Sequence, residues 1–143
     1  MNILCVCTGN MCRSPMLEYL LKQELPKNGV HDAVVTGAGT DTVDGSAATD
    51  HSITVMKEIG IDISAHRSRQ MTHAIAEEND VFVVMTPQHG VNLAFYYGVD
   101  PEKMAIPGDG IPDPFGHDLN AYRECRDALV EAIPQLIEDI KAL

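Results

Sequence analysis

Residues 5–15 read CVCTGNMCRSP, and they connect a short apolar run to a segment with helical periodicity. The apolar run at residues 2–6 is typical of a buried parallel strand. Residues 15–25 place apolar side chains on one helical face, and Ser14 followed by Pro15 is a typical helix start. The quoted stretch is therefore expected to turn from the carboxyl end of a strand into the N-terminus of a helix, where parallel sheets bind ligands.

Strands and helices are predicted to alternate along the rest of the chain. Further strands are expected at residues 33–36, 80–85 and 104–106. Further helices are expected at residues 50–59, 88–97 and about 120–143, with loops at 37–48 and 107–118. Pro26 and Gly29 should end the first helix, Gly90 should weaken a later one, and Pro134 should kink the last. The alternation predicts an α/β three-layer sandwich with a four-stranded parallel sheet flanked by helices, built by a single domain over residues 1–143.

Composition and charge narrow the class of protein. Apolar residues make up 45% of the chain, which indicates a packed core, and no apolar run is long enough to span a membrane. The N-terminus does not resemble a signal peptide, and the four cysteines are expected to stay reduced, so a cytoplasmic location is expected. A net charge of −11 argues against a nucleic-acid partner. The first 30 residues carry three basic and two acidic side chains, which leaves their loop suited to an anion.

The residue types in the quoted stretch suit a reactive thiol that meets an anion. Cys7 should face a helix N-terminus with Arg13 nearby, and both features favour a thiolate. Gly9 permits a tight backbone path, so that loop N–H groups can point inward at a tetrahedral oxyanion such as phosphate. Arg13 can place two donors on that oxyanion. Ser14 can donate to the Cys7 sulfur, and Asn10 tolerates a left-handed backbone that would hold the loop.

These residues resemble a known signature. Residues 7–15, CTGNMCRSP, resemble the C-x-G-N-x-C-R-S-P motif of the low-molecular-weight protein tyrosine phosphatases. Asp113-Pro114-Phe115 is similar to the general-acid loop of that family, and residues 66–70, HRSRQ, look like its H-x-x-R-Q segment. The resemblance therefore covers nearly the whole chain.

The resemblance implies a phosphatase that works through a phosphocysteine. Cys7 would attack phosphorus in line, while Arg13 and the loop amides hold the equatorial oxygens. Asp113 would protonate the leaving oxygen and then activate water. Neither a metal nor a cofactor is required, because Arg13 and the amides compensate the charge. The implied partners are a phosphorylated protein and, in the active site, inorganic phosphate or another oxyanion; the chain is expected to act as a monomer.

The same resemblance gives roles to supporting residues. Cys12 would trap an oxidised Cys7 as a disulfide and shield it from irreversible oxidation. His66 would brace the loop through Asn10. The residues expected to bind phosphate or support the loop are Thr8, Gly9, Asn10, Met11, Cys12, Ser14 and His66.

Several positions depart from the family pattern. Gly37 replaces a serine that helps to hold the loop, and Thr86 stands where many relatives have aspartate. Val43 stands where many have Trp or Tyr, and Phe115 is the one aromatic residue clearly placed near the site. The expected substrate mouth, formed by Met11, Val43 and Phe115, is therefore poor in aromatic surface for stacking on a phosphotyrosine ring.

Position 11 bears on the choice of substrate. A bacterial branch of the family hydrolyses phosphoarginine and shares the DPFG loop and the sparse aromatic wall, but its members usually carry Thr at this position. Met11 is apolar and bulky, nearer to the Ile of tyrosine-specific members. Because Met11 lies within the phosphate loop itself, phosphotyrosine is the predicted substrate and phosphoarginine the alternative.

Single residues also have plainer interpretations. Cys7 and Arg13 could be a buried cysteine and a surface arginine, and Cys7 with Cys12 could ligate zinc, although no second Cys/His pair is close in sequence. Asp113 could simply start a turn before proline. Cys12 could be a packing residue and His66 a surface or capping one. Ordinary surface or turn positions are predicted for His31, His51, His73, His89 and His117.

Three other functions fit parts of the sequence. An arsenate reductase uses the same fold and loop but needs a further cysteine near the middle of the chain, and residues 60–110 contain none. A phosphocarrier domain must keep its phosphocysteine, so it would need neither Asp113 as a base nor the Arg13–Ser14 pair. A phosphoprotein-binding module without activity would lack a residue needed for turnover, and none is missing here.

Overall fold

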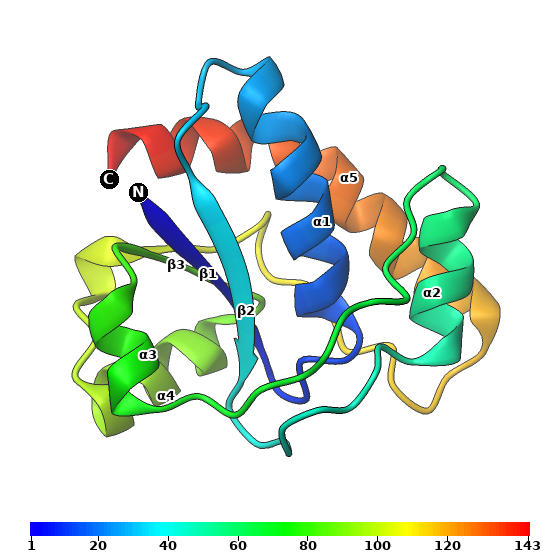
Figure 1. The fold of residues 1–143 in the computed structure, drawn as a ribbon, viewed down its shortest axis with the longest axis horizontal. Coiled ribbons are helices and arrows are strands. Elements are labelled where there is room, and N and C mark those ends of the chain that lie inside the picture. Colours follow the sequence, from blue (N-terminus) through cyan, green and yellow to red (C-terminus); the bar gives the residue numbers. More distant parts are fainter.

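The computed structural model describes residues 1–143, and its centre is a four-stranded parallel sheet (Figure 1). The strands lie in the order β2-β1-β3-β4. Their bounds are β1 (Asn2–Cys7), β2 (Val34–Gly39), β3 (Val81–Val84) and β4 (Met104–Ala105). β1 pairs in parallel with both β2 and β3, which makes it an inner strand. The predicted α/β fold with a four-stranded parallel sheet is confirmed.

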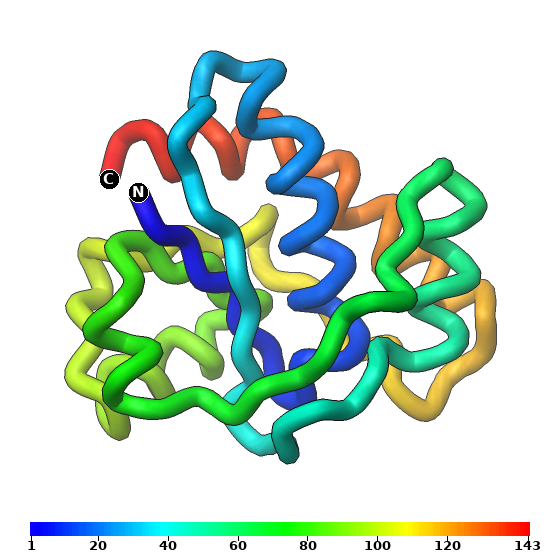
Figure 2. The backbone as a smooth tube through the Cα atoms, in the orientation of Figure 1, coloured from blue at the N-terminus to red at the C-terminus, as the bar shows by residue number.

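Helices cover both faces of this sheet and give the molecule three layers (Figures 1 and 2). One face carries α1 (Arg13–Lys27), α2 (Asp50–Lys57) and α5 (Leu119–Ala142). The other face carries α3 (His73–Glu78) and α4 (Pro87–Tyr97), and a 3-10 turn, η1 (Pro101–Lys103), precedes β4. No helix has both the length and the apolar character that crossing a membrane requires.

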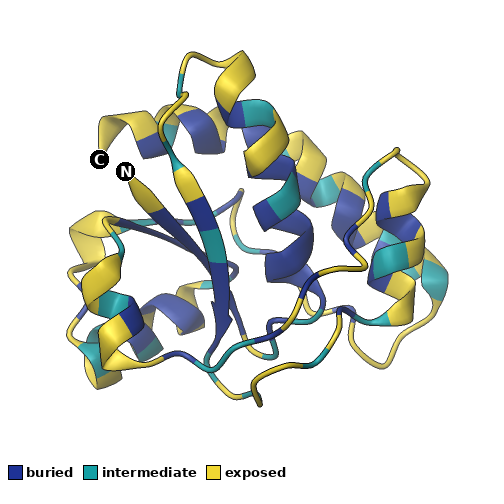
Figure 3. Cartoon of the chain, in the orientation of Figure 1, coloured by how far each residue is buried: buried dark blue, intermediate teal, exposed yellow.

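The two faces of β1 contribute to two separate cores, because successive side chains of a strand point to opposite sides. Ile3, Cys5 and Cys7 belong to the larger core with α1 and α5, whereas Leu4 and Val6 belong to the smaller core with α3 and α4. Figure 3 shows the buried residues gathered on the sheet and on the helix surfaces that face it. Cys7 therefore leaves the sheet from a rigid, fully packed strand.

The first helix differs from its prediction at both ends. α1 begins at Arg13 with Cys12 in the N-cap position, so Ser14 is not the cap. The Ser14 hydroxyl is unavailable for capping because it is engaged by other side chains of the loop. Pro26 lies in the last turn rather than ending the helix, which continues to Lys27.

The second strand is longer than predicted. β2 continues through Gly39, although the sequence predicts a loop from residue 37. A Cβ atom at Gly39 would lie 2.6 Å from the carbonyl oxygen of Thr8, and one at Gly37 would lie 2.8 Å from Nδ2 of Asn10. Both distances are shorter than a carbon atom tolerates. The glycines that suggest a loop are thus what lets β2 lie directly against residues 8–10.

Two helices on either side of residue 60 depart from the prediction. α2 ends at Lys57 rather than at residue 59. α3 was not predicted, because Ile75 is the single buried residue among its six and no apolar period marks it. Its start is set by Thr72, whose side chain accepts the backbone N–H of Ile75.

Two helices in the C-terminal half of the chain contain residues that usually weaken or break helices. α4 begins at Pro87 and runs through Gly90 to a left-handed cap at Gly98, where φ is 66°. α5 begins at Leu119 and runs through Pro134. Tertiary packing of an apolar face outweighs these local costs, which is the usual balance for helices in a packed protein.

Candidate active site

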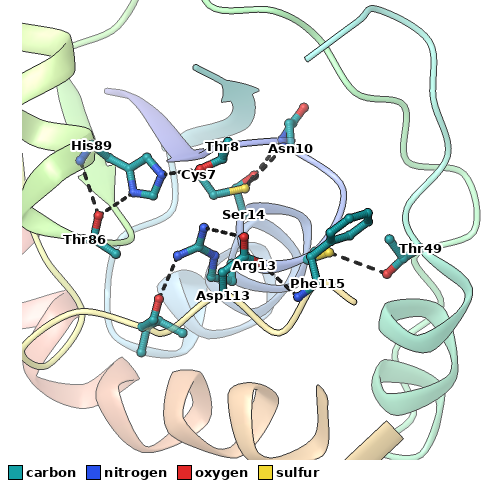
Figure 4. Close-up of polar contacts among 12 residues, drawn as sticks. Cys7, Thr8, Asn10, Arg13, Ser14, Thr49, Thr86, His89, Asp113 and Phe115 are labelled. Atoms are coloured by element: carbon teal, nitrogen blue, oxygen red, sulfur yellow. Dashed lines mark hydrogen bonds and ion pairs between the residues drawn. The ribbon is translucent and has the colours of Figure 1, made fainter. Parts of the chain in front are cut away.

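A pocket of about 200 Å³ opens where β1 ends and α1 begins (Figure 4). Its lining consists of Cys7, Thr8, Gly9, Met11, Cys12, Arg13, Asp41, Asp113 and Phe115. The structure therefore brings the predicted loop together with the distant Asp113–Phe115 segment. Asn10, Ser14 and His66 are buried and do not line the pocket.

A larger apolar groove of about 590 Å³ lies elsewhere, between α4 and β4. Its lining consists of Val84, Pro87, Gly90, Val91, Ala94, Phe95, Pro101, Met104 and Ile106. None of these side chains is nucleophilic or titratable in the ordinary pH range. The chemistry suggested by the sequence therefore belongs to the smaller pocket.

The sulfur of Cys7 is surrounded by donors. Its Sγ atom lies 3.0 Å from Oγ of Ser14 and 3.3 Å from the backbone nitrogen of Asn10. The Nδ2 group of Asn10 donates to the same Ser14 oxygen at 2.7 Å. The hydroxyl that accepts from Asn10 still has its own hydrogen, which it can donate to the Cys7 sulfur when that sulfur is a thiolate. Two donors thus stabilise a negative charge on sulfur.

Asn10 holds the loop in shape with all of its polar groups. It is fully buried and is the one non-glycine residue with a positive φ, at 53°. Its carbonyl oxygen lies 2.6 Å from Nε2 of His66, and its Oδ1 accepts the backbone N–H of Arg69 at 3.0 Å. Arg69 also donates through Nε to the carbonyl oxygen of Gly37. The loop is therefore braced from residues 66–69, and a Ser side chain at position 37 would collide with Asn10.

Arg13 is 3% exposed and has one donor left unpaired. Nη1 donates to the carbonyl oxygen of Ile111 at 2.8 Å, and Nη2 lies 3.6 Å from Oδ2 of Asp113. Nε is buried and has no hydrogen-bond partner in the protein. Buried donors in native proteins are almost always paired. Since Arg13 lines the pocket, an oxyanion bound there would supply the missing acceptor.

Asp113 lies at the mouth of the pocket on a turn. Its side chain is half exposed, and Oδ1 accepts the backbone N–H of Phe115 at 3.1 Å. The turn therefore fixes one carboxylate oxygen, while Oδ2 faces Arg13. Starting a turn and presenting a carboxylate to the pocket are compatible roles for this residue.

Comparisons with known proteins agree on one family. The sequence model described as "Low molecular weight phosphotyrosine protein phosphatase" matches residues 2–143. The chain belongs to this family. The low molecular weight protein-tyrosine-phosphatase Ptp of Acinetobacter johnsonii is 36% identical over 127 residues, 86% of each chain. The protein-arginine-phosphatase of Bacillus subtilis is 34% identical, over 99% of this chain and 97% of the relative.

A solved structure also resembles this one closely. It is a variant of the YwlE arginine phosphatase with a phosphorylated active-site serine, and it matches with a TM-score of 0.89 at 32% identity. The match covers 99% of this chain and 96% of that one. The chain is thus a cysteine-dependent phosphatase of the low-molecular-weight family, whose members act on phosphorylated proteins.

The second cysteine of the phosphatase signature is buried against α5. Cys12 is 6% exposed, and its Sγ lies 3.4 Å from the hydroxyl of Tyr122 and 3.7 Å from Oγ1 of Thr49. Burial raises the pKa of the Cys12 thiol. Burial also raises the pKa of Tyr122 to about 12, with the hydrogen bond to Cys12 contributing. Cys12 is therefore packed and protonated in the resting enzyme, and it lines the pocket beside Cys7.

The rim of the phosphatase pocket differs from its prediction. Met11 and Phe115 line it, whereas Val43 does not and is 66% exposed. Asp41 lines the rim and was missed by the sequence analysis. Its backbone N–H donates to the carbonyl oxygen of Thr8, which ties the end of β2 to the loop. The pairing of β2 with β1 brings Asp41 to the pocket. The sequence could have indicated this only if the last residue of β2 had been predicted correctly.

His89 corrects a second prediction, since it is not a surface or turn residue. It is 7% exposed and stands behind the pocket wall on α4. Its Nε2 lies 2.9 Å from Oγ1 of Thr8, and its Nδ1 lies 2.8 Å from Oγ1 of Thr86 (Figure 4). Burial, followed by the charge of Arg13, lowers the pKa of His89 to about 4. The other four histidines with no predicted role, at positions 31, 51, 73 and 117, are exposed.

Proposed function

We propose that this protein hydrolyses phosphotyrosine on protein substrates through a phosphocysteine formed on Cys7. The observation that carries this proposal is the buried, unpaired Nε of Arg13 in the pocket that also contains the Cys7 sulfur. A phosphoryl group above the sulfur would accept from this donor and from backbone N–H groups of the loop. The pocket thus supplies a nucleophile and a cradle for the transferred group.

The first step is attack by the Cys7 sulfur on phosphorus, with the tyrosine oxygen leaving on the opposite side. The hydrogen bonds from Ser14 and from the Asn10 backbone stabilise the thiolate before attack. They stabilise it again when water displaces sulfur from the phosphocysteine. Arg13 spreads the charge of the equatorial oxygens in both transition states.

Asp113 is the proposed proton donor and acceptor. It gives its proton to the leaving phenolate and then removes one from the water that attacks the phosphocysteine. Its position at the mouth, opposite the base of the pocket where Cys7 lies, supports this role. The half-exposed side chain is accessible to both the leaving group and the incoming water.

Met11 and Phe115 favour an aromatic leaving group. Both line the rim, and a thioether and a phenyl ring can flank the ring of phosphotyrosine. Phosphoarginine is the second candidate, because Asp41 also lines the rim. A phosphorylated guanidinium keeps cationic character that a carboxylate attracts, and a phenyl ring has none. The relatives include both a tyrosine phosphatase and an arginine phosphatase.

Initial rates on a phosphotyrosine peptide and a matched phosphoarginine peptide test the substrate. Wild type is expected to prefer phosphotyrosine, Met11→Thr to shift the ratio toward phosphoarginine, and Asp41→Asn to shift it away. Asp32→Asn removes an equal charge from an exposed site outside the pocket and should change neither rate. Faster phosphoarginine turnover by wild type would make the second candidate the correct one.

The remaining expectations concern the protein in the cell. We propose that residues 1–143 act as one domain, as a monomer in the cytoplasm. All four cysteines are free and buried, which fits a reducing compartment. Light scattering should give the mass of one chain, 15.6 kDa, and cell fractionation should place the protein with cytoplasmic markers. A dimer mass or a membrane fraction would contradict these assignments.

Oxidative protection of Cys7 is a further part of the proposal. Peroxide oxidises the Cys7 thiolate to a sulfenic acid and is itself reduced to hydroxide, and the Cys12 thiolate then attacks that sulfur, forming a disulfide and releasing a second hydroxide. The raised pKa of Cys12 makes this second step slow at neutral pH and faster as pH rises. After peroxide and then reductant, Cys12→Ser should recover less activity than wild type. Equal recovery would leave Cys12 as a packing residue.

A further inference from the structure

The contacts of His89 connect the N-terminus of α4 to the phosphate loop. Thr86 is the N-cap of α4, and Thr8 lines the pocket. The imidazole lies between their hydroxyl groups, with one ring nitrogen on each (Figure 4). The direction in which each hydrogen bond runs decides whether the Thr8 hydroxyl has a hydrogen to offer to the pocket.

The contacts of Thr86 set that direction. Its Oγ1 accepts the backbone N–H of His89 at 3.3 Å. The single hydrogen of this hydroxyl has one acceptor in the structure, Nδ1 of His89. If Nδ1 carried a hydrogen instead, the Thr86 hydrogen would have no partner in a partly buried site, which is unfavourable. Nδ1 is therefore an acceptor.

The ring then determines the state of Thr8. A neutral imidazole that accepts through Nδ1 carries its hydrogen on Nε2, so Nε2 donates to Oγ1 of Thr8. The ring is neutral at pH 7, because burial and the charge of Arg13 lower the pKa of His89 to about 4 against a smaller opposing effect of Asp113. Thr8 accepts from His89 and keeps its own hydrogen free for the pocket that it lines.

We propose that the Thr8 hydroxyl is a further donor to the bound phosphoryl group, and that His89, oriented by Thr86, is the positioning residue that directs it. This inference rests on the proposed phosphatase function and deepens it. The donor would reach the anion from the loop residue that His89 of α4 contacts, whereas Arg13 would reach it from the start of α1. A nonpolar residue at position 89 would leave the Thr8 hydrogen without a set direction.

Nitrogen-15 NMR of histidine-labelled enzyme tests the hydrogen-bond direction without any substrate. The His89 signals, identified by their loss in His89→Gln, should show an unprotonated Nδ1 and a protonated Nε2. They should not titrate between about pH 5.5 and 8, unlike an ordinary histidine. A protonated Nδ1, or a titration in that range, would overturn the proposal.

Inhibition by inorganic phosphate tests the link between the two residues. Thr8→Val should weaken inhibition by at least about tenfold, the effect of one hydrogen bond to an ionised acceptor. His89→Leu should weaken it similarly in wild type and not at all in the Thr8→Val background. Thr8→Ser keeps the hydroxyl and should be inhibited as strongly as wild type. His31→Leu, at an exposed position, should leave inhibition unchanged. Additive losses in the double variant would show that His89 does not act through Thr8.

Thr86→Val provides a second route if His89→Leu fails to fold. It removes the donor to Nδ1, so the His89 spectrum should become a mixture of tautomers and phosphate inhibition should weaken. An unchanged single tautomer would contradict the inferred direction. Failure of the proposed function looks different, since wild type would then release no phosphate from p-nitrophenyl phosphate while the NMR result stood.

Discussion

The base and the rim of the pocket differ in how firmly their side chains are held. Arg13 lies at the base, and Asn10 and Ser14 support it from within the loop without lining the pocket; all three are at most 3% exposed and make hydrogen bonds through their side chains. At the rim, Phe115 is 62% exposed, and neither it nor the exposed Asp41 makes a side-chain hydrogen bond. The proposed phosphoryl transfer therefore depends on a firmly held base, and the proposed substrate choice on an exposed rim.

Cys7→Ser should produce the largest effect, because it removes the nucleophile from the base. A serine hydroxyl is a far weaker nucleophile than a thiolate, so kcat should fall by at least about 10⁴-fold. Phosphate should still bind to the intact cradle, as titration calorimetry can measure. Turnover close to wild type would place the nucleophile elsewhere.

Asp113→Asn should produce the next largest effect, and the effect should depend on the leaving group. Loss of general acid catalysis should slow hydrolysis of a phosphotyrosine peptide by about 10²- to 10³-fold. p-Nitrophenyl phosphate should lose less, because its phenolate leaves readily without a proton. An equal loss for both substrates would make Asp113 a structural turn residue only.

Asn10 tests the rigidity of the base. Both Asn10→Ala and Asn10→Gly remove the donor that orients Ser14, so each should lower kcat, by about 10²-fold. Asn10→Ala should also be less stable than Asn10→Gly by about 1 kcal/mol, because alanine resists the left-handed backbone. Thermal unfolding of the pair measures this difference. Equal stability would mean that the loop has relaxed to another backbone conformation.

His89 extends the rigid base to α4 and makes stability depend on pH. Its folded-state pKa is about 4, below the ordinary 6.5, so the unfolded chain binds a proton first as pH falls. The neutral His89 ring gives its full contribution to the free energy of unfolding above pH 6.5. Protonation of the unfolded chain should lower that free energy by about 3 kcal/mol by pH 4. The stability advantage of wild type over His89→Gln, measured by urea unfolding, should shrink across this window. A stability difference that stays constant across this window would show that His89 binds protons equally well in the folded and unfolded chains.

The rim should give the smallest effects. Phe115→Ala should lower kcat/KM for a phosphotyrosine peptide about fivefold through lost ring contact, while kcat stays near wild type. Val43→Ala provides a control at another exposed apolar residue, because Val43 does not line the pocket. A loss of 10²-fold or more at Phe115 would make the rim part of the rigid base.

The sequence predicted the base well because its residues are local. Residues 7–14 form one continuous turn from strand to helix, so their types and spacing specify the cradle directly. Position 113 and position 66 were added by resemblance alone. The contacts of His66 and Arg69 with Asn10 join segments more than fifty residues apart, so they could be identified only in the folded structure.

The missed features all depend on long-range packing. Asp41 reaches the rim only because Gly37 and Gly39 let β2 continue beside the loop, and glycine-rich composition predicts the opposite. His89 has no motif, and its burial follows from the docking of α4 against β3. Thr86, singled out as a departure from the family pattern, lies with its hydroxyl 2.8 Å from Nδ1 of His89.

The central claim is that the phosphoryl group passes through Cys7, and acid-quenched turnover tests it most directly. Wild type mixed with excess p-nitrophenyl phosphate, quenched within one turnover and digested, should yield a phosphorylated peptide containing Cys7. Asp113→Asn gives a second sample in which the same peptide should be found. A phosphate on another residue, or a burst of p-nitrophenol with no phosphoprotein, would contradict the claim.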